Sequence, residues 1–229
     1  MKKIAGLFIV FGFVLAAPVL KLFAQSSFEG TITWTMSIPM LDDDKHSMIV
    51  NVKGDKSVMD MDMGVQGNVM VYSDRSTKKM TMVMTAMKSG MIMDMNEIKT
   101  TKDDPIDMKP SGKKETIAGH PAEEYLIKGA HSDISLWVTN DMPKDIQYCF
   151  YNSLSNNPRQ DANETKAMKQ LVDQGYVPIR IVLKSAGETQ MSMEFVKYDR
   201  KSVADAVFVI PSDIKISPMP KGAAGGGMN

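Results

Sequence analysis

The chain has 229 residues, one cysteine, and equal numbers of basic and acidic side chains, 27 of each. This length suits a single domain with a sizeable hydrophobic core. A single cysteine excludes an internal disulfide bond. The balanced charge argues against nucleic acid and anionic lipid as partners, because both require a concentrated basic surface.

Residues 1–24 have the layout of a cleaved secretory signal. Lys2 and Lys3 precede an uncharged apolar run over residues 4–20, and "LFAQSS" then supplies a small residue, Ala24, at the cleavage position. The run is shorter than the ~20 residues that a membrane-spanning helix needs. We therefore expect cleavage after Ala24 and a periplasmic or secreted protein, with an uncleaved N-terminal anchor as the alternative. Cleavage leaves 24 basic against 27 acidic residues.

Alternation of apolar and polar residues dominates residues 28–95 and predicts β-strands. On "KKMTMVMTAM", for example, Met80, Met82 and Met84 share one face, and Val83 lies on the other. We expect a meander of antiparallel strands with one apolar and one solvated face. The stretches that show the alternation are "FEGTITWTMSI", "HSMIVNVK", "KSVMDMDM", "NVMVYSD", "KKMTMVMTAM" and "MIMDM".

The second half of the chain combines further strands with a helical insertion. Residues 96–113 are polar with two prolines and are expected to form a surface loop. Apolar residues at helical spacing predict helices over residues 143–175, with Gly175 as a left-handed cap. We therefore expect one domain over residues 25–217 with about ten strands, and a flexible tail over residues 218–229. The later strands are predicted in "KETIAGHPAEEYLIKG", "DISLWVTND", "VPIRIVLKSAG" and "ETQMSMEFVKYD", with "AVFVIP" as the closing segment.

Methionine is concentrated in one region, since 11 of the 22 methionines lie between residues 59 and 95. Freezing a methionine costs up to ~2 kcal/mol of side-chain entropy, against ~0.5–1 kcal/mol for leucine or isoleucine. Methionine also lacks the β-branching that favours strands. The penalty shrinks where the side chains stay mobile, as they do on surfaces that adapt to varied apolar partners. The pattern suggests a concave methionine face that holds an acyl chain, a lipid or a lipidated partner.

Nine residues are expected to contact this ligand through adaptable packing rather than chemistry. A slip of one residue in strand register would move them all to the solvated face. The predicted ligand-binding set is Trp34, Met61, Met63, Met82, Met84, Met93, Met95, Met191 and Met193.

Other interpretations of the methionines remain open. They can fill an irregular core and bind nothing, in an envelope domain with a structural or interaction role. Thioethers also bind Cu(I), and Met80, Met82 and Met84 share a strand face on which they could converge. Exposed methionines can absorb oxidants as sulfoxides. Cys149, in the apolar stretch "IQYCFY", is expected to be a buried and inert thiol.

Catalytic signatures are missing from the sequence. No HExxH, GxSxG, P-loop or CxxC motif occurs, and the three aspartates at residues 42–44 do not have the spacing of an EF-hand. We expect no enzymatic activity, no cofactor and no resident metal.

Four stretches resemble one exported bacterial family of domains of unknown function: "SFEGTITWTM", "ETIAGHPAEEYLIK", "LWVTNDMP" and "AVFVIPSDIK". The fold of that family is similar to the LolA/LolB lipoprotein carriers. The resemblance implies an α+β domain with a curled antiparallel sheet, a half-barrel, packed on one or two helices. It also implies a hydrophobic concavity, but it carries no catalytic residues. The methionine density here is higher than the resemblance leads us to expect.

Overall fold

The computed structural model describes residues 28–40, 44–94, 108–128, 133–147, 149, 167 and 170–218. The predicted signal sequence, Met95 and the tail beyond residue 218 lie outside them. The described strands are β1 (Gly30–Ser37), β2 (His46–Lys53), β3 (Lys56–Asp62), β4 (Asn68–Asp74), β5 (Lys79–Met84), β6 (Ser89–Asp94), β7 (Met108–Ile117), β8 (His120–Lys128), β9 (Asp133–Thr139), β10 (Val177–Ser185), β11 (Glu188–Arg200) and β12 (Lys215–Pro218). Two 3₁₀ turns, η1 (Gly64–Gln66) and η3 (Asp205–Phe208), are also present.

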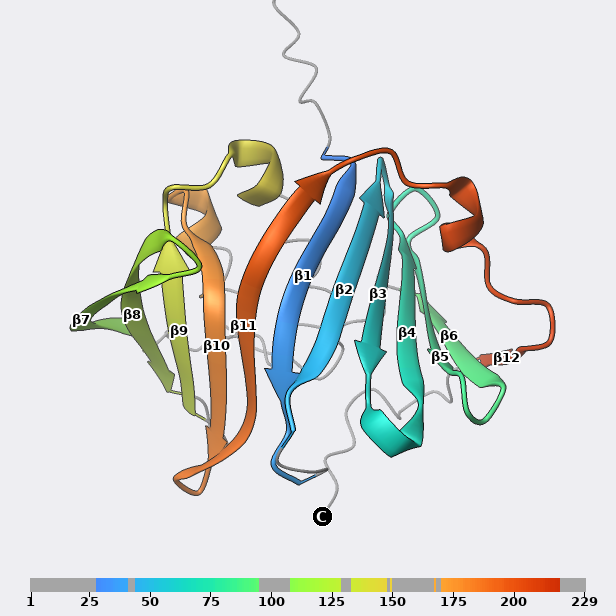
Figure 1. Ribbon diagram of the computed structural model, residues 1–229, viewed down its shortest axis with the longest axis horizontal. Helices are drawn as coiled ribbons and strands as arrows, with labels where there is room; N and C mark the ends of the chain where they lie inside the picture. Colours follow the sequence, from blue (N-terminus) through green and yellow to red (C-terminus); the bar gives the residue numbers. More distant parts are fainter. Residues whose placement is uncertain are drawn as a thin grey trace, which may run out of the picture.

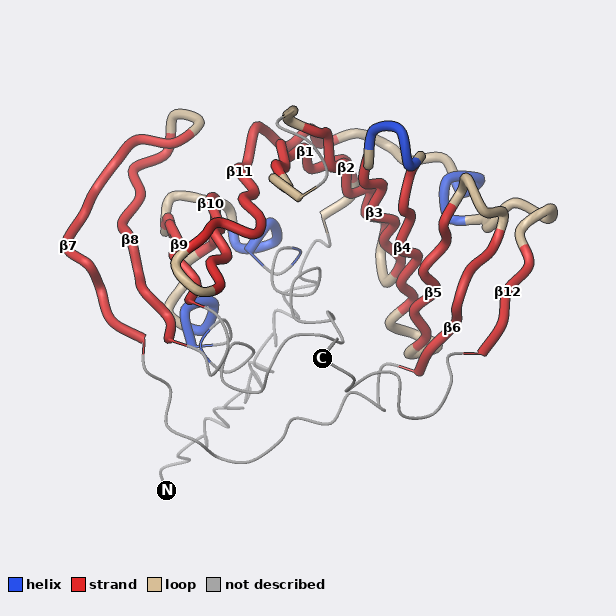
Figure 2. Tube along the Cα trace, turned by 90° about the horizontal axis from the view of Figure 1, so that it is seen from below, coloured by secondary structure: helices blue, strands red, loops and turns tan. Residues whose placement is uncertain are grey.

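The strands form one sheet of twelve, in the order β12-β6-β5-β4-β3-β2-β1-β11-β10-β9-β8-β7 (Figure 1). The sheet is curved like an arch and does not close, so β7 and β12 are its two edges (Figure 2). The prediction of a large, curled antiparallel sheet is therefore confirmed. The expected number of about ten strands is wrong, because the described residues contain twelve.

Two segments differ from the sequence prediction. Residues 108–113, expected in a loop, begin the edge strand β7. The segment "AVFVIP" forms η3 and an extended stretch, and the closing strand is β12 further along the chain. Strand β12 pairs parallel with β6, whereas every other pair in the sheet is antiparallel.

The main core lies on the inner side of the arch. Residues 144–147 and 170–173 are helical and lie on that side (Figure 2). Within the described residues, no helix has the length and apolarity to cross a membrane. The fully buried members of the core that come from the predicted insertion are Ile146, Ala167 and Leu171, which join side chains of β1, β2, β8, β9, β10 and β11.

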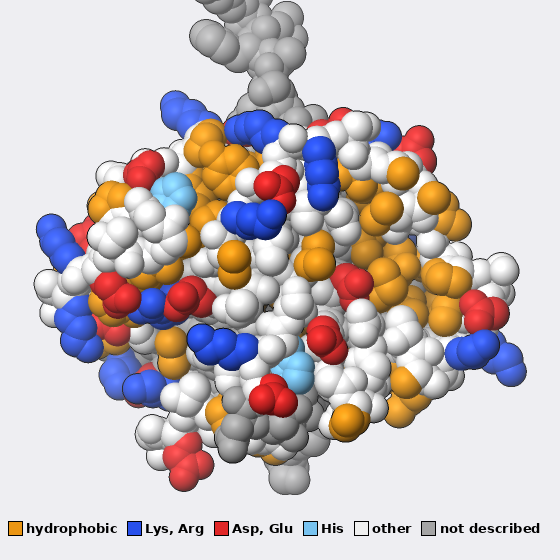
Figure 3. Space-filling view, viewed as in Figure 1, with side chains coloured by type: hydrophobic (Ala, Val, Ile, Leu, Met, Phe, Trp, Pro, Cys, Tyr) orange, Lys and Arg blue, Asp and Glu red, His pale blue; other side chains and the backbone are white. Residues whose placement is uncertain are grey.

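A second, smaller cluster lies on the outer side of the arch. Val58, Tyr72 and Val83 form it, and Phe208, Ile210 and Ile214 pack against them. The expectation that Val83 faces solvent is wrong: its side chain is 0% exposed. The reason is that residues 203–214 cross the outer side of β3–β5 and cover it. Apolar side chains accordingly gather over this part of the outer side in Figure 3.

Polar contacts attach the crossing segment to the sheet. The Lys53 ammonium lies 2.8 Å from the Asp205 carboxylate. The backbone N–H of Val203 donates a 2.9 Å hydrogen bond to the Glu29 carboxylate. Further along, Lys88 pairs with Asp213 at 3.0 Å. Strands β3–β5 are therefore covered on their outer side.

Candidate functional site

Methionines line the inner side of β2–β6 in three cross-strand rows. Directly paired residues share a face of a sheet, so the strand register fixes which side chains are neighbours. We call this surface the methionine face. Its rows are Val52–Ser57–Ser73–Met80–Met93, Val50–Met59–Val71–Met82–Met91 and Met48–Met61–Val69–Met84–Ser89.

The same surface continues onto the centre of the sheet. Trp34 pairs with Met48 on one side and with Phe195 on the other. Met193 pairs with Met36, and Met191 pairs with Leu183. Trp34, Met191 and Met193 therefore lie on the same side of the sheet as Met61 and Met82, which is the strand parity expected from the sequence.

Burial divides the predicted ligand-binding residues into two groups. Trp34 is 3% exposed and its ring meets Phe195 edge-to-face at 5.9 Å, so it is part of the core. Met93 and Met193 are also buried. The half-buried members, which keep surface accessible on the inner side, are Met61, Met63, Met82, Met84 and Met191.

Reactive or metal-binding groups are sparse in the described part of the chain. It contains no group of three or more His, Cys, Asp or Glu side chains that could hold a metal ion. Burial raises the pKa of the Cys149 thiol to about 11. The thiol is therefore protonated at neutral pH, as an inert cysteine should be.

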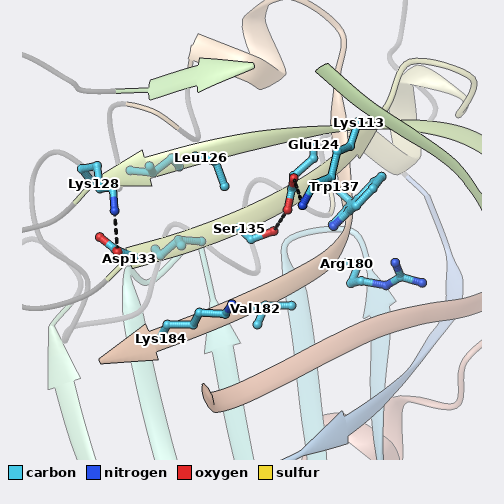
Figure 4. Close-up of a pocket in the computed structure, with 12 residues that line it drawn as sticks. Lys113, Glu124, Leu126, Lys128, Asp133, Ser135, Trp137, Arg180, Val182 and Lys184 are labelled. Atoms are coloured by element: carbon cyan, nitrogen blue, oxygen red, sulfur yellow. Dashed lines mark hydrogen bonds and ion pairs between the residues drawn. The ribbon is translucent and has the colours of Figure 1, made fainter. Parts of the chain in front are cut away.

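A second site, which the sequence analysis missed, lies on the outer side of β8–β10 (Figure 4). It is a hollow of about 390 Å³. Three cross-strand rows form its floor, and Lys113 of β7 lies at its edge. The rows of this outer hollow are Glu124–Trp137–Arg180, Leu126–Ser135–Val182 and Lys128–Asp133–Lys184.

A bulge in β7 encloses the Glu124 carboxylate. Pro110 and Lys114 pair with residues on either side of Glu124, so three residues of β7 oppose this one residue of β8. Gly112, in the middle of the bulge, has φ +82°, which favours glycine. The hydroxyl of Ser111 donates a 2.7 Å hydrogen bond to Glu124 Oε2, and the Lys113 ammonium lies 3.3 Å from the same oxygen.

The Glu124 carboxylate is buried and ionised. It is only 6% exposed, and Ser135 donates a short hydrogen bond to its Oε1. Burial raises the pKa of Glu124, but the hydrogen bonds from Ser135, Ser111 and Lys113 together outweigh burial and hold the pKa below its ordinary value. The carboxylate is thus a fixed negative charge at one end of the outer hollow.

A second bulge places Arg180 beside Trp137. Pro178 pairs with Val138 and Arg180 with Trp137, so Ile179 is the extra residue, and it is fully buried. The Arg180 guanidinium lies 5.6 Å from the centre of the Trp137 ring, a cation–π contact.

The charge of Arg180 is compensated by carboxylates beside the hollow. Its Nη1 and Nη2 donate to the two oxygens of Glu115 at 2.8 and 3.0 Å. Its Nε donates to Glu194 at 2.6 Å. Both charged groups of this row, Glu124 and Arg180, therefore already have partners.

The model of one family, described as domain of unknown function (DUF4412), matches residues 28–214. The chain belongs to this family. The prediction of membership in a family of unknown function is therefore confirmed. No curated protein matches the chain.

Three solved structures illustrate what the DUF4412 domain is similar to. An uncharacterized conserved protein from Thermus thermophilus superposes with a TM-score of 0.51 at 9% identity, over 83% of this chain and 91% of that one. MucB gives a TM-score of 0.43 at 11% identity, over 82% of this chain and 59% of that one. A LolA superfamily protein from Nitrosomonas europaea gives 0.33 at 11% identity, over 82% and 92%. The Thermus likeness shows a shared fold.

One signal in the sequence could have located the outer hollow of the DUF4412 domain. In "DISLWVTND", Trp137 lies on the face of the strand that alternation predicts to be solvated. Ile134, Leu136 and Val138 lie on the opposite face. A large aromatic side chain on a face expected to be solvated indicates that other residues cover this part of the face or that it binds a ligand. The bulges that bring Ser111 and Arg180 to the hollow leave no comparable signal in the residue spacing.

Replacing Glu124 by glutamine should destabilise the DUF4412 domain by about 1.5–3 kcal/mol at pH 7, because hydrogen bonds to an ionised group are worth about that much. The folded pKa is lowered, so this stabilisation is present above the unfolded value of about 4.3 and is lost as the pH falls through the folded pKa. Urea unfolding between pH 3 and 7 measures the difference in the free energy of unfolding between wild type and Glu124→Gln. This difference should become smaller below about pH 4. Glu188→Gln, at the exposed first residue of β11, is the control. A stability difference that does not change with pH would contradict an ionised Glu124.

Proposed function

We propose that this DUF4412 domain is exported, has no enzymatic activity, and binds an apolar ligand on its methionine face. The ligand class is a lipid, an acyl chain or a lipidated partner. The observation that carries the proposal is the set of half-buried methionines on the inner side of one curved sheet. Residues 1–24, with the layout of a secretory signal, support export.

The composition of the methionine face favours an apolar ligand. The residues paired in its three rows are methionine, valine and serine, and none carries a charge. Each buried methylene group contributes about 0.8 kcal/mol, so an acyl chain of several carbons gains enough free energy to bind without any polar anchor.

Side-chain flexibility favours a ligand of variable shape. Met82 and Met84 are half-buried, so they retain rotamers that a valine at the same position would lack. Two valines of this face, Val69 and Val71, belong to β4, the strand that pairs with β5, and give the methionines of β5 a stiffer base. A face of this kind adapts to chains that differ in length or unsaturation.

The test is purification of the protein from its native envelope, followed by organic extraction and mass spectrometry. Wild type should release lipid, and the delipidated protein should bind a fluorescent fatty acid saturably. The double variant Met82→Asp with Met84→Asp should lose both, because two carboxylates would have to be desolvated beside the chain. Met87→Asp is the matched control, since this side chain is 71% exposed in the β5–β6 turn.

Two results would reject the proposal. Wild-type protein that carries no lipid and binds no fatty acid would leave an envelope domain without a ligand. Stoichiometric Cu(I) binding that is abolished by Met80→Leu, Met82→Leu and Met84→Leu together, with no fatty-acid binding, would assign the thioethers to copper instead.

A further inference from the structure

We propose that the outer hollow is a second binding site, which takes a small organic carboxylate with an apolar body. It lies on the opposite side of the sheet from the methionine face, and on β8–β10 rather than β2–β6. The ligand's hydrocarbon part occupies the middle row, and its carboxylate meets Lys184 and Lys128.

The size and the lining of the hollow fit such a molecule. Its volume of about 390 Å³ lies at the lower end of small-molecule sites, which span about 300–1,000 Å³. The middle row presents the apolar side chains of Leu126 and Val182, and Leu126 is 40% exposed. Successive rows are two residues apart, or about 7 Å along a strand. A chain of about six carbons therefore covers the middle row and reaches a charged row.

The two charged rows differ in what they still offer to a ligand. At one end, Glu124 and Arg180 are compensated by the contacts described above. At the other end, Lys128 pairs with Asp133 at 2.6 Å, and Lys184 is the cross-strand neighbour of the same aspartate. Within the described part of the chain, no ion pair involves Lys184. Two ammonium groups thus face one carboxylate, which leaves one positive charge for an anionic ligand.

Charge at both ends also sets the orientation of the ligand. The positive charges of the Glu124 row, Arg180 and Lys113, are already paired with carboxylates, so the anionic end of the ligand is directed to the row that holds Lys184. Figure 4 shows Lys128, Asp133 and Lys184 together at the end of the hollow opposite Glu124 and Arg180. A neutral molecule lacks the ionic contact, and a cationic one meets the lysines.

The test uses hexanoate as the probe, with 1-hexanol and hexylamine as matched neutral and cationic probes. Isothermal titration calorimetry and the indole N–H signal of Trp137 report binding at the hollow. Hexanoate should bind saturably and shift the Trp137 signal, and hexanol should bind about tenfold more weakly. Added salt should weaken hexanoate binding, because the site is exposed.

Two variants locate the contacts. Lys184→Gln should weaken hexanoate about tenfold without changing stability, because Lys184 is exposed. Lys197→Gln removes an exposed lysine on β11, outside the hollow, and should leave binding unchanged. Met82→Asp with Met84→Asp should also leave hexanoate binding unchanged. The proposal for the outer hollow and the proposal for the methionine face can therefore be rejected independently of each other.

Three outcomes overturn the inference. Hexanoate and hexylamine could bind equally, Lys184→Gln could have no effect, or hexanoate could fail to shift the Trp137 signal. If a neutral monosaccharide shifts that signal and hexanoate does not, the hollow is a carbohydrate site.

Discussion

Gly30→Ala is expected to lower the free energy of unfolding by about 4 kcal/mol, from backbone strain and from overpacking combined. Gly30 has φ +155°, a region that side chains rarely adopt. A Cβ atom there would lie 2.1 Å from the backbone oxygen of Asp199. That oxygen belongs to β11, so relief requires separation of β1 from β11, the pair that joins the two halves of the sheet.

Gly54→Ala is the control for this effect. Gly54 also has a positive φ, +59°, but nothing lies within 4 Å of the position of its Cβ. Only the backbone penalty of about 1–2 kcal/mol applies to it. Urea unfolding followed by circular dichroism measures both variants. Equal losses would show that the contact with Asp199 does not limit this position.

Trp34→Ala is expected to cost about 3–5 kcal/mol, the usual range for a fully buried aromatic side chain. Trp34 is 3% exposed and lies between Met48 and Phe195 in the pairing of the central strands. Met82→Ala should cost less than the roughly 2–5 kcal/mol of a fully buried methionine, because Met82 is half-buried. Denaturant unfolding compares the two variants.

Variants at Trp34 and Met82 also distinguish a residue that belongs to the core from a residue that contacts the ligand. Trp34→Phe keeps an aromatic ring against Phe195 and should recover part of the lost stability. Fatty-acid binding should fall for Met82→Ala while its fold remains intact. If Trp34→Ala folds with nearly wild-type stability but loses ligand, Trp34 contacts the ligand directly, as the sequence analysis expected.

Strand faces were predictable from the sequence because alternation is a local property. The parity of Met61, Met82 and Met193 follows from a period of two, and the register places them on one side. Alternation cannot show what covers the other side. Val83 is buried by residues 203–214, more than a hundred positions along the chain, and no local pattern encodes that contact.

The outer hollow could not be predicted because it depends on strand irregularities. Ser111 and Lys113 reach Glu124 only because β7 bulges, and Arg180 reaches Trp137 only because Ile179 is inserted. The bulge in β10 adds one residue and changes parity at that point, so an alternating pattern assigns the residues around it incorrectly. The bulge in β7 adds two residues, which keeps parity but displaces the pairing, and alternation does not reveal that displacement.

An arch with two open edges has a consequence for the behaviour of the protein at high concentration. Unpaired strand edges recruit strands of other molecules and start fibrils unless they are blocked. At the β7 edge, Pro110 lacks an N–H group, the bulge interrupts the ladder, and Lys113 and Lys114 add repulsive charge. The β12 edge is four residues long and ends at Pro218. Both edges are thus poor templates for pairing with strands of other molecules. This lets a protein with an open sheet remain monodisperse in a crowded compartment.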